Sequence, residues 1–399
     1  LSGKRESLKE LIKRLHKGET PEKIKREFQK MAKDVTPGEI AQIEQELIKE
    51  GMPREEIQKF CDVHLSAFKD VLEKEKLLAP PGHPVHILME EHKILLKFAN
   101  DLKDLANVLK GEKDFVSADV QMRQLDHIAE HLKASESHYV REENVLFPYL
   151  EKHGITEPPA IMWTEHDKIR EVKKTLYETF DARNEIGLRN FTKQVEGQAI
   201  SLLEMLSDHF YKENNILFPT ALRVITEDEW PELRRQFDEL GYCCFTPETA
   251  RKPFARRELR AETPEAGGEL SLDTGSLSKE EIESILNTLP VDITFIDKED
   301  TVKYFSQTRE RIFPRTKAVI GRKVQQCHPQ KSLHLVNQLL EEFKSGKRDE
   351  AAFWINVGDR LAYIRYFTVR SKNGDYLGCV EVTQDITEVK RTEGEKRLL

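Results

Sequence analysis

A duplicated motif restricts the fold of this chain more than any other feature. Residues 138–148 read HYVREENVLFP, and residues 209–219 read HFYKENNILFP. The histidine, the glutamate four residues later and the closing Leu-Phe-Pro occupy equivalent positions, 71 residues apart. A Glu-His pair precedes each copy, at Glu91-His92 and at Glu165-His166. The pattern predicts a pair of helices that occurs twice.

Helical periodicity extends over residues 85–245 and predicts four long helices, at about 85–110, 117–147, 158–183 and 188–218. Short connections between long helices favour an antiparallel up-down-up-down bundle. Residues i and i+4 share one helix face, so His138 and Glu142 project together. His209 and Glu213 do the same in the second copy. We expect these two stripes to converge on one cavity with His92 and His166.

The converging side chains are candidate metal ligands, because a core carboxylate is costly unless it is paired or bound to a metal. The predicted ligands are His92, His138, Glu142, His166, His209 and Glu213. Four imidazoles and two carboxylates, without thiolates, suit a first-row metal such as iron. Each half supplies two histidines and one carboxylate, which favours a dinuclear centre. The carboxylates are expected to bridge two iron ions, leaving positions for an oxo or hydroxo bridge and a small ligand.

The sequence gives weaker evidence that other polar residues near the motif belong to the metal site. Glu143 is rotated by roughly 100° from Glu142 and is expected at the surface. His131 lies seven residues before His138. It is either exposed, hydrogen-bonded locally, or placed behind the ligands or along a channel to them. Cys243 and Cys244 are expected to form a small buried pair rather than a redox switch.

Composition restricts the class of function. The net charge of −8 argues against a general nucleic-acid binder, because phosphate binding needs clustered positive charge. Five cysteines without regular spacing fit a reducing compartment. No apolar run approaches the roughly 20 residues that span a bilayer. We therefore expect a cytoplasmic protein.

The regions on either side of the bundle have different patterns. Residues 5–76 contain repeated helix-start signals at Thr20-Pro21, Thr36-Pro37 and Met52-Pro53. Cys61 and His64 share one helix face there, and either pack the helix or reach the metal cavity. Residues 246–278, rich in Pro, Gly and Thr, are predicted to be a linker. Strands are expected at 291–297, 302–306, 361–369 and 376–383, with a hairpin at Asn373-Gly374 and a helix at 331–345.

The set of six ligands resembles the hemerythrin-like (HHE) domains, of which the His-x3-Glu and Phe-Pro context is typical. Hemerythrins proper carry a fifth histidine on the third helix, where this chain has Arg170 and Met162. The site is therefore similar to the six-ligand branch that includes bacterial iron-centre repair proteins. This departure disfavours simple oxygen carriage and leaves a position for chemistry or nitric oxide.

The flanking regions resemble domains that accompany such bundles. Residues 1–78 are similar to a helical domain of unknown function. Residues 279–392 resemble a PAS domain through Leu289-Pro290, Gly321-Arg322, His328-Pro329 and residues 383–387. The expected fold is multidomain: an all-α N-terminal region, an antiparallel four-helix bundle over 85–245, the linker and an α+β PAS domain. His328 and His334 leave a heme site in the PAS region as an alternative.

The combination predicts a di-iron sensor that binds or reacts with O2, NO or peroxide. Its output is expected to pass through a protein partner or a homodimer of the PAS domain. Two alternatives stay open at this point. One is an enzyme or iron donor for iron–sulfur repair or for NO and peroxide reduction, and the other is iron storage or iron sensing.

Overall fold

The computed structural model describes residues 79–253 and 270–395, together with scattered positions between residues 7 and 50. The chain divides into two compact units, Leu1–Arg256 and Arg257–Leu399. The predicted helix starts at Thr20, Thr36 and Met52 lie outside the described residues, as do Cys61 and His64. No helix of the described residues is both long enough and apolar enough to cross a membrane.

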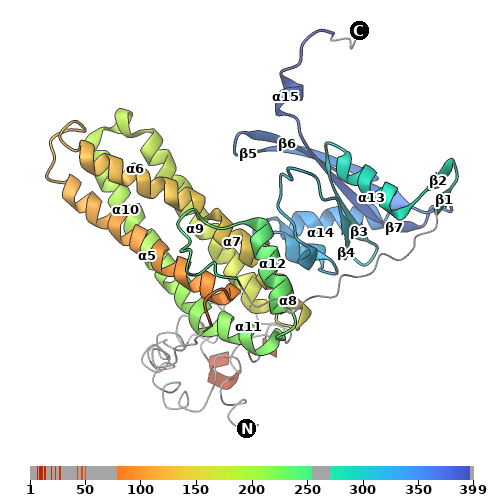
Figure 1. The fold of residues 1–399 in the computed structure, drawn as a ribbon, viewed down its shortest axis with the longest axis horizontal. Helices are drawn as coiled ribbons and strands as arrows, with labels where there is room; N and C mark the ends of the chain where they lie inside the picture. The colour runs from red at the N-terminus through yellow and green to blue at the C-terminus, as the bar shows by residue number, and fades with distance from the viewer. Residues whose placement is uncertain are drawn as a thin grey trace. The chain divides into compact units, whose positions relative to one another are not determined.

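The first unit contains the predicted bundle, coloured orange to green in Figure 1. Its long elements are α5 (Pro84–Leu109), α6 (Asp119–Ala134) continued by α7 (Glu136–Arg141), α9 (Glu157–Asp181) and α10 (Arg183–Lys212). The four predicted helices are thereby confirmed. A further helix, α12 (Trp230–Leu240), was not predicted as a separate element; it contacts α5 and α7.

Both copies of the motif leave α-helical geometry at the glutamate. The segments η2 (Glu142–Leu146) and η3 (Glu213–Leu217) are π-helical, and they lead into α8 (Phe147–Lys152) and α11 (Phe218–Val224). Pro148 and Pro219 stand at the start of these next helices, and proline within a helix removes an N–H donor and crowds the preceding turn. The predicted helices were therefore too regular here. Such π-turns are frequent at functional sites.

The bundle core extends along the helices beyond the candidate ligands. Leu95 and Leu102 of α5 pack with Leu125 of α6 and with Phe191 and Leu202 of α10, and all five are fully buried. Gly187, with φ of 74°, breaks the first turn of α10, so the regular helix begins at about the predicted position. These layers hold the four helices at fixed positions around the site.

The second unit is an antiparallel five-stranded sheet with strand order β4-β3-β7-β6-β5. The strands are β3 (Asp292–Asp297), β4 (Val302–Phe305), β5 (Glu350–Val357), β6 (Arg360–Arg370) and β7 (Tyr376–Asp385). The four predicted strands are confirmed, as are the β6–β7 hairpin around Asn373-Gly374 and the helix α14 (Gln330–Lys344). Strand β5 was not predicted, because its side chains are mostly exposed and lack the alternation of a half-buried strand.

Shorter elements complete this unit. Helix α13 (Lys279–Thr288) precedes β3 and starts with a capping box made by Ser278 and Glu281. The 3-10 turns η4 (Lys317–Val319) and η5 (Val324–Cys327) connect β4 to α14, and α15 (Thr387–Lys390) follows β7. A small hairpin, β1 (Leu270–Leu272) and β2 (Gly275–Leu277), lies within the stretch that was predicted to be only a linker.

Candidate metal centre

The structure brings all six predicted ligands together inside the bundle. They form two quartets whose ligand atoms lie within 4.8 Å of one another. The first contains His92, His138, Glu142 and Glu213, and the second contains Glu142, His166, His209 and Glu213. The two quartets share both carboxylates, and every member is buried. The cluster thus has the arrangement of two adjacent sites with common bridging residues.

The two carboxylates face both halves of the repeat. Glu213 directs Oε2 to His92 Nε2 and Oε1 to His209 Nε2, each at 3.0 Å. Glu142 Oε2 lies 3.6 Å from His138 Nε2 and 3.4 Å from His166 Nε2. Across the cavity, the Nε2 atoms of His166 and His209 are 3.0 Å apart. One carboxylate therefore already reaches both halves through separate oxygen atoms.

The chemistry of the donors fits a metal. Both oxygens of Glu142 and of Glu213 are buried, and their contacts with the histidine Nε2 atoms do not have hydrogen-bond geometry. The Nε2 atoms of His92 and His138 are in the same condition. Buried polar atoms are normally hydrogen-bonded, so six such atoms aimed into one cavity indicate a cation that completes them. Nitrogen and carboxylate oxygen donors suit first-row metals.

A carboxylate from the same half of the repeat holds one histidine in each motif. His138 Nδ1 lies 2.7 Å from Glu91 Oε2, and His209 Nδ1 lies 2.8 Å from Glu165 Oε2. The residue three positions after each histidine then pairs with the same carboxylate. Arg141 Nη2 donates to Glu91 and Lys212 Nζ donates to Glu165, both at 2.7 Å. Each Glu-His pair of the sequence therefore contains one candidate ligand and one carboxylate that supports a histidine of the motif.

The other two histidines are held by the opposite half. His166 Nδ1 lies 2.8 Å from Glu143 Oε1, and His92 Nδ1 lies 3.1 Å from Asn214 Oδ1. Glu143 is 5% exposed, so its predicted surface position was wrong. Arg170, four residues after His166, donates to both Glu143 oxygens, at 2.8 and 3.1 Å. An acceptor on Nδ1 fixes the tautomer and leaves Nε2 as the free donor atom.

Charges around the supporting carboxylates keep them ionised. Burial alone would raise the pKa of Glu91, but Arg141 and His138 lower it to about 2. Burial likewise opposes ionisation of Glu165, while His209 and Lys212 lower its pKa to about 2. Acceptors that stay negatively charged strengthen the basicity of the histidines that they contact.

The ligands themselves respond to burial in opposite ways. Burial lowers the pKa of His138 to about 4, which keeps its imidazole neutral, as a metal ligand requires. Burial, and then repulsion from Glu213, raise the pKa of Glu142. Two buried carboxylates whose ligand atoms lie within 4.8 Å of each other cannot both ionise easily without positive charge between them. A divalent ion would remove that conflict.

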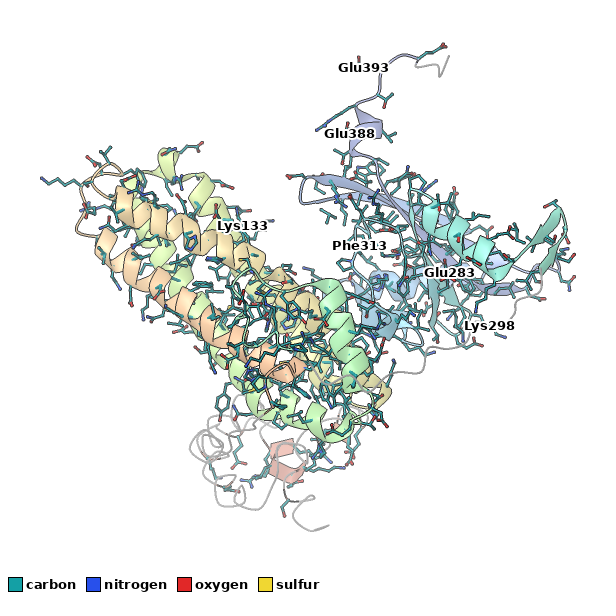
Figure 2. All side chains as sticks on the ribbon, in the orientation of Figure 1. Lys133, Glu283, Lys298, Phe313, Glu388 and Glu393 are labelled. Carbon is teal, nitrogen blue, oxygen red and sulfur yellow. The ribbon has the colours of Figure 1, made fainter. Side chains whose placement is uncertain are left out.

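Aromatic rings from the motif line the cavity. His92 stacks on Phe210 at 3.9 Å between ring centroids and on Phe218 at 5.5 Å. Phe147, the equivalent of Phe218, stacks on His166 at 5.8 Å. The Leu-Phe pairs of the motif thus pack the core, as predicted, and they also exclude water from the ligands. Figure 2 shows side chains filling the space between the helices in this part of the bundle.

His131 and His328 have partners outside the set of candidate ligands. His131 Nδ1 contacts Cys244 Sγ at 3.1 Å, and its Nε2 contacts His127 Nε2 at 2.9 Å. Cys243 is buried but Cys244 is exposed, so the predicted buried pair was wrong for its second member. In the second unit, His328 Nδ1 lies 2.9 Å from the Val324 carbonyl oxygen.

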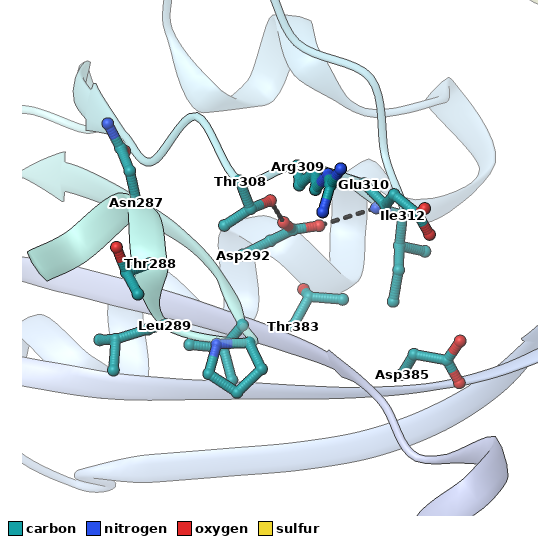
Figure 3. Close-up of a pocket in the computed structure, with 12 residues that line it drawn as sticks. Asn287, Thr288, Leu289, Asp292, Thr308, Arg309, Glu310, Ile312, Thr383 and Asp385 are labelled. Atoms are coloured by element: carbon teal, nitrogen blue, oxygen red, sulfur yellow. Dashed lines mark hydrogen bonds between the residues drawn. The ribbon is translucent and has the colours of Figure 1, made fainter. Parts of the chain in front are cut away.

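A pocket of about 270 Å³ in the second unit differs chemically from the cavity of the bundle (Figure 3). Asp292 lies in it and accepts hydrogen bonds from the Thr308 hydroxyl and from the Ile312 backbone N–H, the latter at 2.8 Å. Thr383 and Asp385 also line the pocket. With no histidine or cysteine in its wall, it lacks the donor set of the bundle.

Family models match three successive parts of the chain. "Family of unknown function (DUF438)" matches residues 8–74, "Hemerythrin HHE cation binding domain" matches residues 83–221 and "PAS domain" matches residues 282–387. These matches confirm the three resemblances seen in the sequence. The likeness to the iron-centre repair branch stays a prediction.

Several solved structures are similar to parts of the chain. A C-terminal domain from Streptococcus mutans is 32% identical and covers 32% of this chain and 100% of its own length, with a TM-score of 0.31. The PAS domain of Bordetella pertussis BvgS is 19% identical, over 28% of this chain and 90% of its own, with a TM-score of 0.24. The sensor region of a sensor histidine kinase is 18% identical, over 25% of this chain and 41% of its own, with a TM-score of 0.21.

These TM-scores are too low to add to the assignment, and no curated protein matches the chain. The family models, the fold of each unit and the two His/Glu quartets agree with one another. The chain thus combines a DUF438 region, a metal-binding bundle of the hemerythrin HHE type and a C-terminal PAS domain.

Proposed function

We propose that the bundle holds two iron ions and that the protein senses O2, NO or peroxide. The observation that carries this proposal is the pair of quartets that share Glu142 and Glu213. One metal would be held by His92 and His138, the other by His166 and His209, with both carboxylates between them. We further propose the domains 1–78, 85–245 and 279–392, with 246–278 as the linker.

The iron ions, when bound, would supply a change of oxidation state and coordination positions for a small ligand. The protein's part is to present the donors in the correct form. Glu91, Glu143 and Glu165 accept from three Nδ1 atoms, so the corresponding Nε2 atoms carry their lone pairs into the cavity. The absence of thiolates from both quartets supports iron over a structural zinc site.

The segment that leaves the bundle contacts the residues around His138, which supports a route for the signal. The Thr246 hydroxyl donates to Glu91, and the Arg141 guanidinium lies 4.9 Å from the Tyr242 ring. Cys243 Sγ is 3.8 Å from Arg141 Nη2. A change in charge at His138 would therefore alter the contacts of residues 242–246, which precede the PAS domain in the sequence.

The PAS domain offers a surface for output to a second copy or another protein. Strand β5 is an edge strand, and Trp354 is 66% exposed on it. Phe353 and Ile355, its neighbours, are 44% and 42% exposed. An exposed apolar edge strand is a common site for association of chains. We therefore propose that the partner or dimer contact is made by β5.

Anaerobic purification, metal analysis and optical spectra during addition of O2 and then NO test the site. We expect about two irons per chain and a separate spectral change with each reactive gas. His138→Ala and Glu213→Ala should both lose the change, while His153→Ala, outside the cavity, should keep it. Fewer than one iron per chain under iron-replete expression would contradict a dinuclear site.

Hydrogen exchange in the reduced, oxidised and NO-treated protein tests the sensor. We expect residues 242–253 and the PAS strands to change their exchange rates between these states. Identical exchange and identical association in all three states would exclude a sensor. Steady turnover of NO or peroxide with a reductant, or repair of a damaged iron–sulfur protein, would instead support the alternative of an enzyme or iron donor. Uptake of iron far beyond two per chain would support storage.

A further inference from the structure

A second cluster of reactive side chains lies on the outside of the bundle. It contains Cys244, which follows α12, and His127 and His131, which lie one turn apart on α6. Cys244 Sγ is 3.1 Å from His131 Nδ1, and His131 Nε2 is 2.9 Å from His127 Nε2. The three groups form a continuous chain of contacts that ends at an exposed thiol.

The geometry of the contacts from Cys244 through His131 to His127 determines where the protons lie. Only one proton fits between the two Nε2 atoms. When the thiol donates to His131 Nδ1, the His131 Nε2 carries the other proton and donates it to His127. This assignment makes His131 the proton acceptor for Cys244, with His127 as the group that orients it. A nucleophile, a base and an orienting third group in series is the general arrangement of an activated nucleophile.

The surroundings of His131 hold it in this role. Its ring stacks on Phe98 at 5.0 Å, with an angle of 4° between the planes, and meets Phe245 edge-on. Burial, and then the neighbouring His127, lower the pKa of His131, while Glu130 acts in the opposite direction. The imidazole is therefore neutral near pH 7 and able to accept a proton.

We propose that Cys244 is a peroxide-reactive thiol and that His131 is its base, independently of the metal centre. His131 Nδ1 takes the thiol proton while the sulfur attacks one oxygen of hydrogen peroxide. A sulfur–oxygen bond forms, the oxygen–oxygen bond breaks, and the leaving hydroxide recovers the proton from His131 as water. The cysteine is oxidised by two electrons to a sulfenic acid, and the peroxide is reduced to water.

The other cysteines of the described residues provide internal controls. Cys243 and Cys379 are buried, and burial raises their pKa values to about 11 and about 12. Cys327 is partly exposed, but its Sγ contacts the Lys323 carbonyl oxygen rather than a histidine. Cys327 is thus the matched thiol with access to solvent and without a base.

The test treats the full-length protein with hydrogen peroxide in the presence of a 1,3-diketone that traps sulfenic acids. Mass mapping of peptides then gives the rate at each cysteine. We expect Cys244 to react at least about 10-fold faster than Cys327, since a positioned general base contributes a factor of this order or more. The same ratio should hold after iron is removed with a chelator, because the cluster needs no metal.

Two variants test how much His131 and His127 each contribute to the oxidation rate of Cys244. His131→Phe keeps a ring on Phe98 and removes both nitrogens. The oxidation rate of Cys244 should therefore fall to within about twofold of the rate of Cys327. His127→Phe removes only the orienting group and should reduce the rate by about two- to fivefold. The proposal is overturned if Cys244 reacts no faster than Cys327 in the wild type, a comparison that needs no variant to fold. It is also overturned if folded His131→Phe keeps the wild-type rate or if the reaction requires iron.

Discussion

The substitution Glu143→Gln tests whether the supporting residues set the affinity of the metal centre. Glu143 is the charged acceptor for His166 Nδ1, at 2.8 Å, whereas His92 has the neutral acceptor Asn214, at 3.1 Å. The substitution therefore makes the support of His166 similar to that of His92, with little change in volume. It also removes the carboxylate that Arg170 contacts.

The expected loss of metal affinity follows from the contacts that the substitution keeps and those that it removes. Loss of a supporting partner costs about 10- to 100-fold in metal affinity. The new amide still offers an oxygen to Nδ1, so we expect the lower end, about tenfold, which equals roughly 1.4 kcal/mol. Arg170 keeps Glu136 at 2.7 Å and remains 26% exposed, which limits the cost to folding.

Anaerobic titration of the metal-free protein with Fe2+ against a competing chelator measures this affinity. Glu136→Gln is the matched control, because it removes another carboxylate that Arg170 contacts without touching His166. It should change the affinity by less than about twofold. Equal affinities in the two variants would refute the reasoning, provided that both have wild-type melting temperatures without metal.

Three further predictions concern stability. Removal of metal should lower the melting temperature of the bundle, since a ligand at 100 times its Kd stabilises by about 2.7 kcal/mol; an unchanged melting curve after chelation would contradict a resident metal. His83 caps α5 by accepting from the Val85 N–H, and burial lowers its pKa to about 4. Because the unfolded state takes up the proton first, His83 should contribute a loss of up to roughly 3 kcal/mol to the stability of the metal-free bundle as pH drops from about 6.5 to 4. In urea titrations, His83→Asn should remove this part of the fall and leave the part due to His138, whose pKa burial also lowers to about 4. In the PAS domain, Gly378 has φ of 149° and a Cβ there would lie 2.0 Å from the Ile296 carbonyl oxygen; Gly378→Ala should destabilise that unit by about 2 kcal/mol or more, leaving the bundle's unfolding unchanged.

The sequence determined the six candidate ligands because they are positioned by local rules. Spacing of four residues places His138 and Glu142 on one helix face, and the duplication repeats the arrangement at His209 and Glu213. A regular hydrophobic period likewise sufficed for the four helices of the bundle. In the PAS domain, β-branched alternation and the Asn373-Gly374 turn were enough for four of the five strands of the main sheet.

Tertiary structure alone decided which residues support the ligands. Glu143 was expected at the surface because a straight α-helix turns it about 100° from Glu142. The π-turn at 142–146 changes the rotation per residue, and His166 and Arg170, more than 20 residues away in sequence, surround the carboxylate. Glu91 and Glu165 each stand directly before a candidate histidine ligand in the sequence, yet only the packed helices show that they contact other histidines. Contacts between distant segments have no local period, so the pairs His131–Cys244 and Thr246–Glu91 became visible only once the chain was folded.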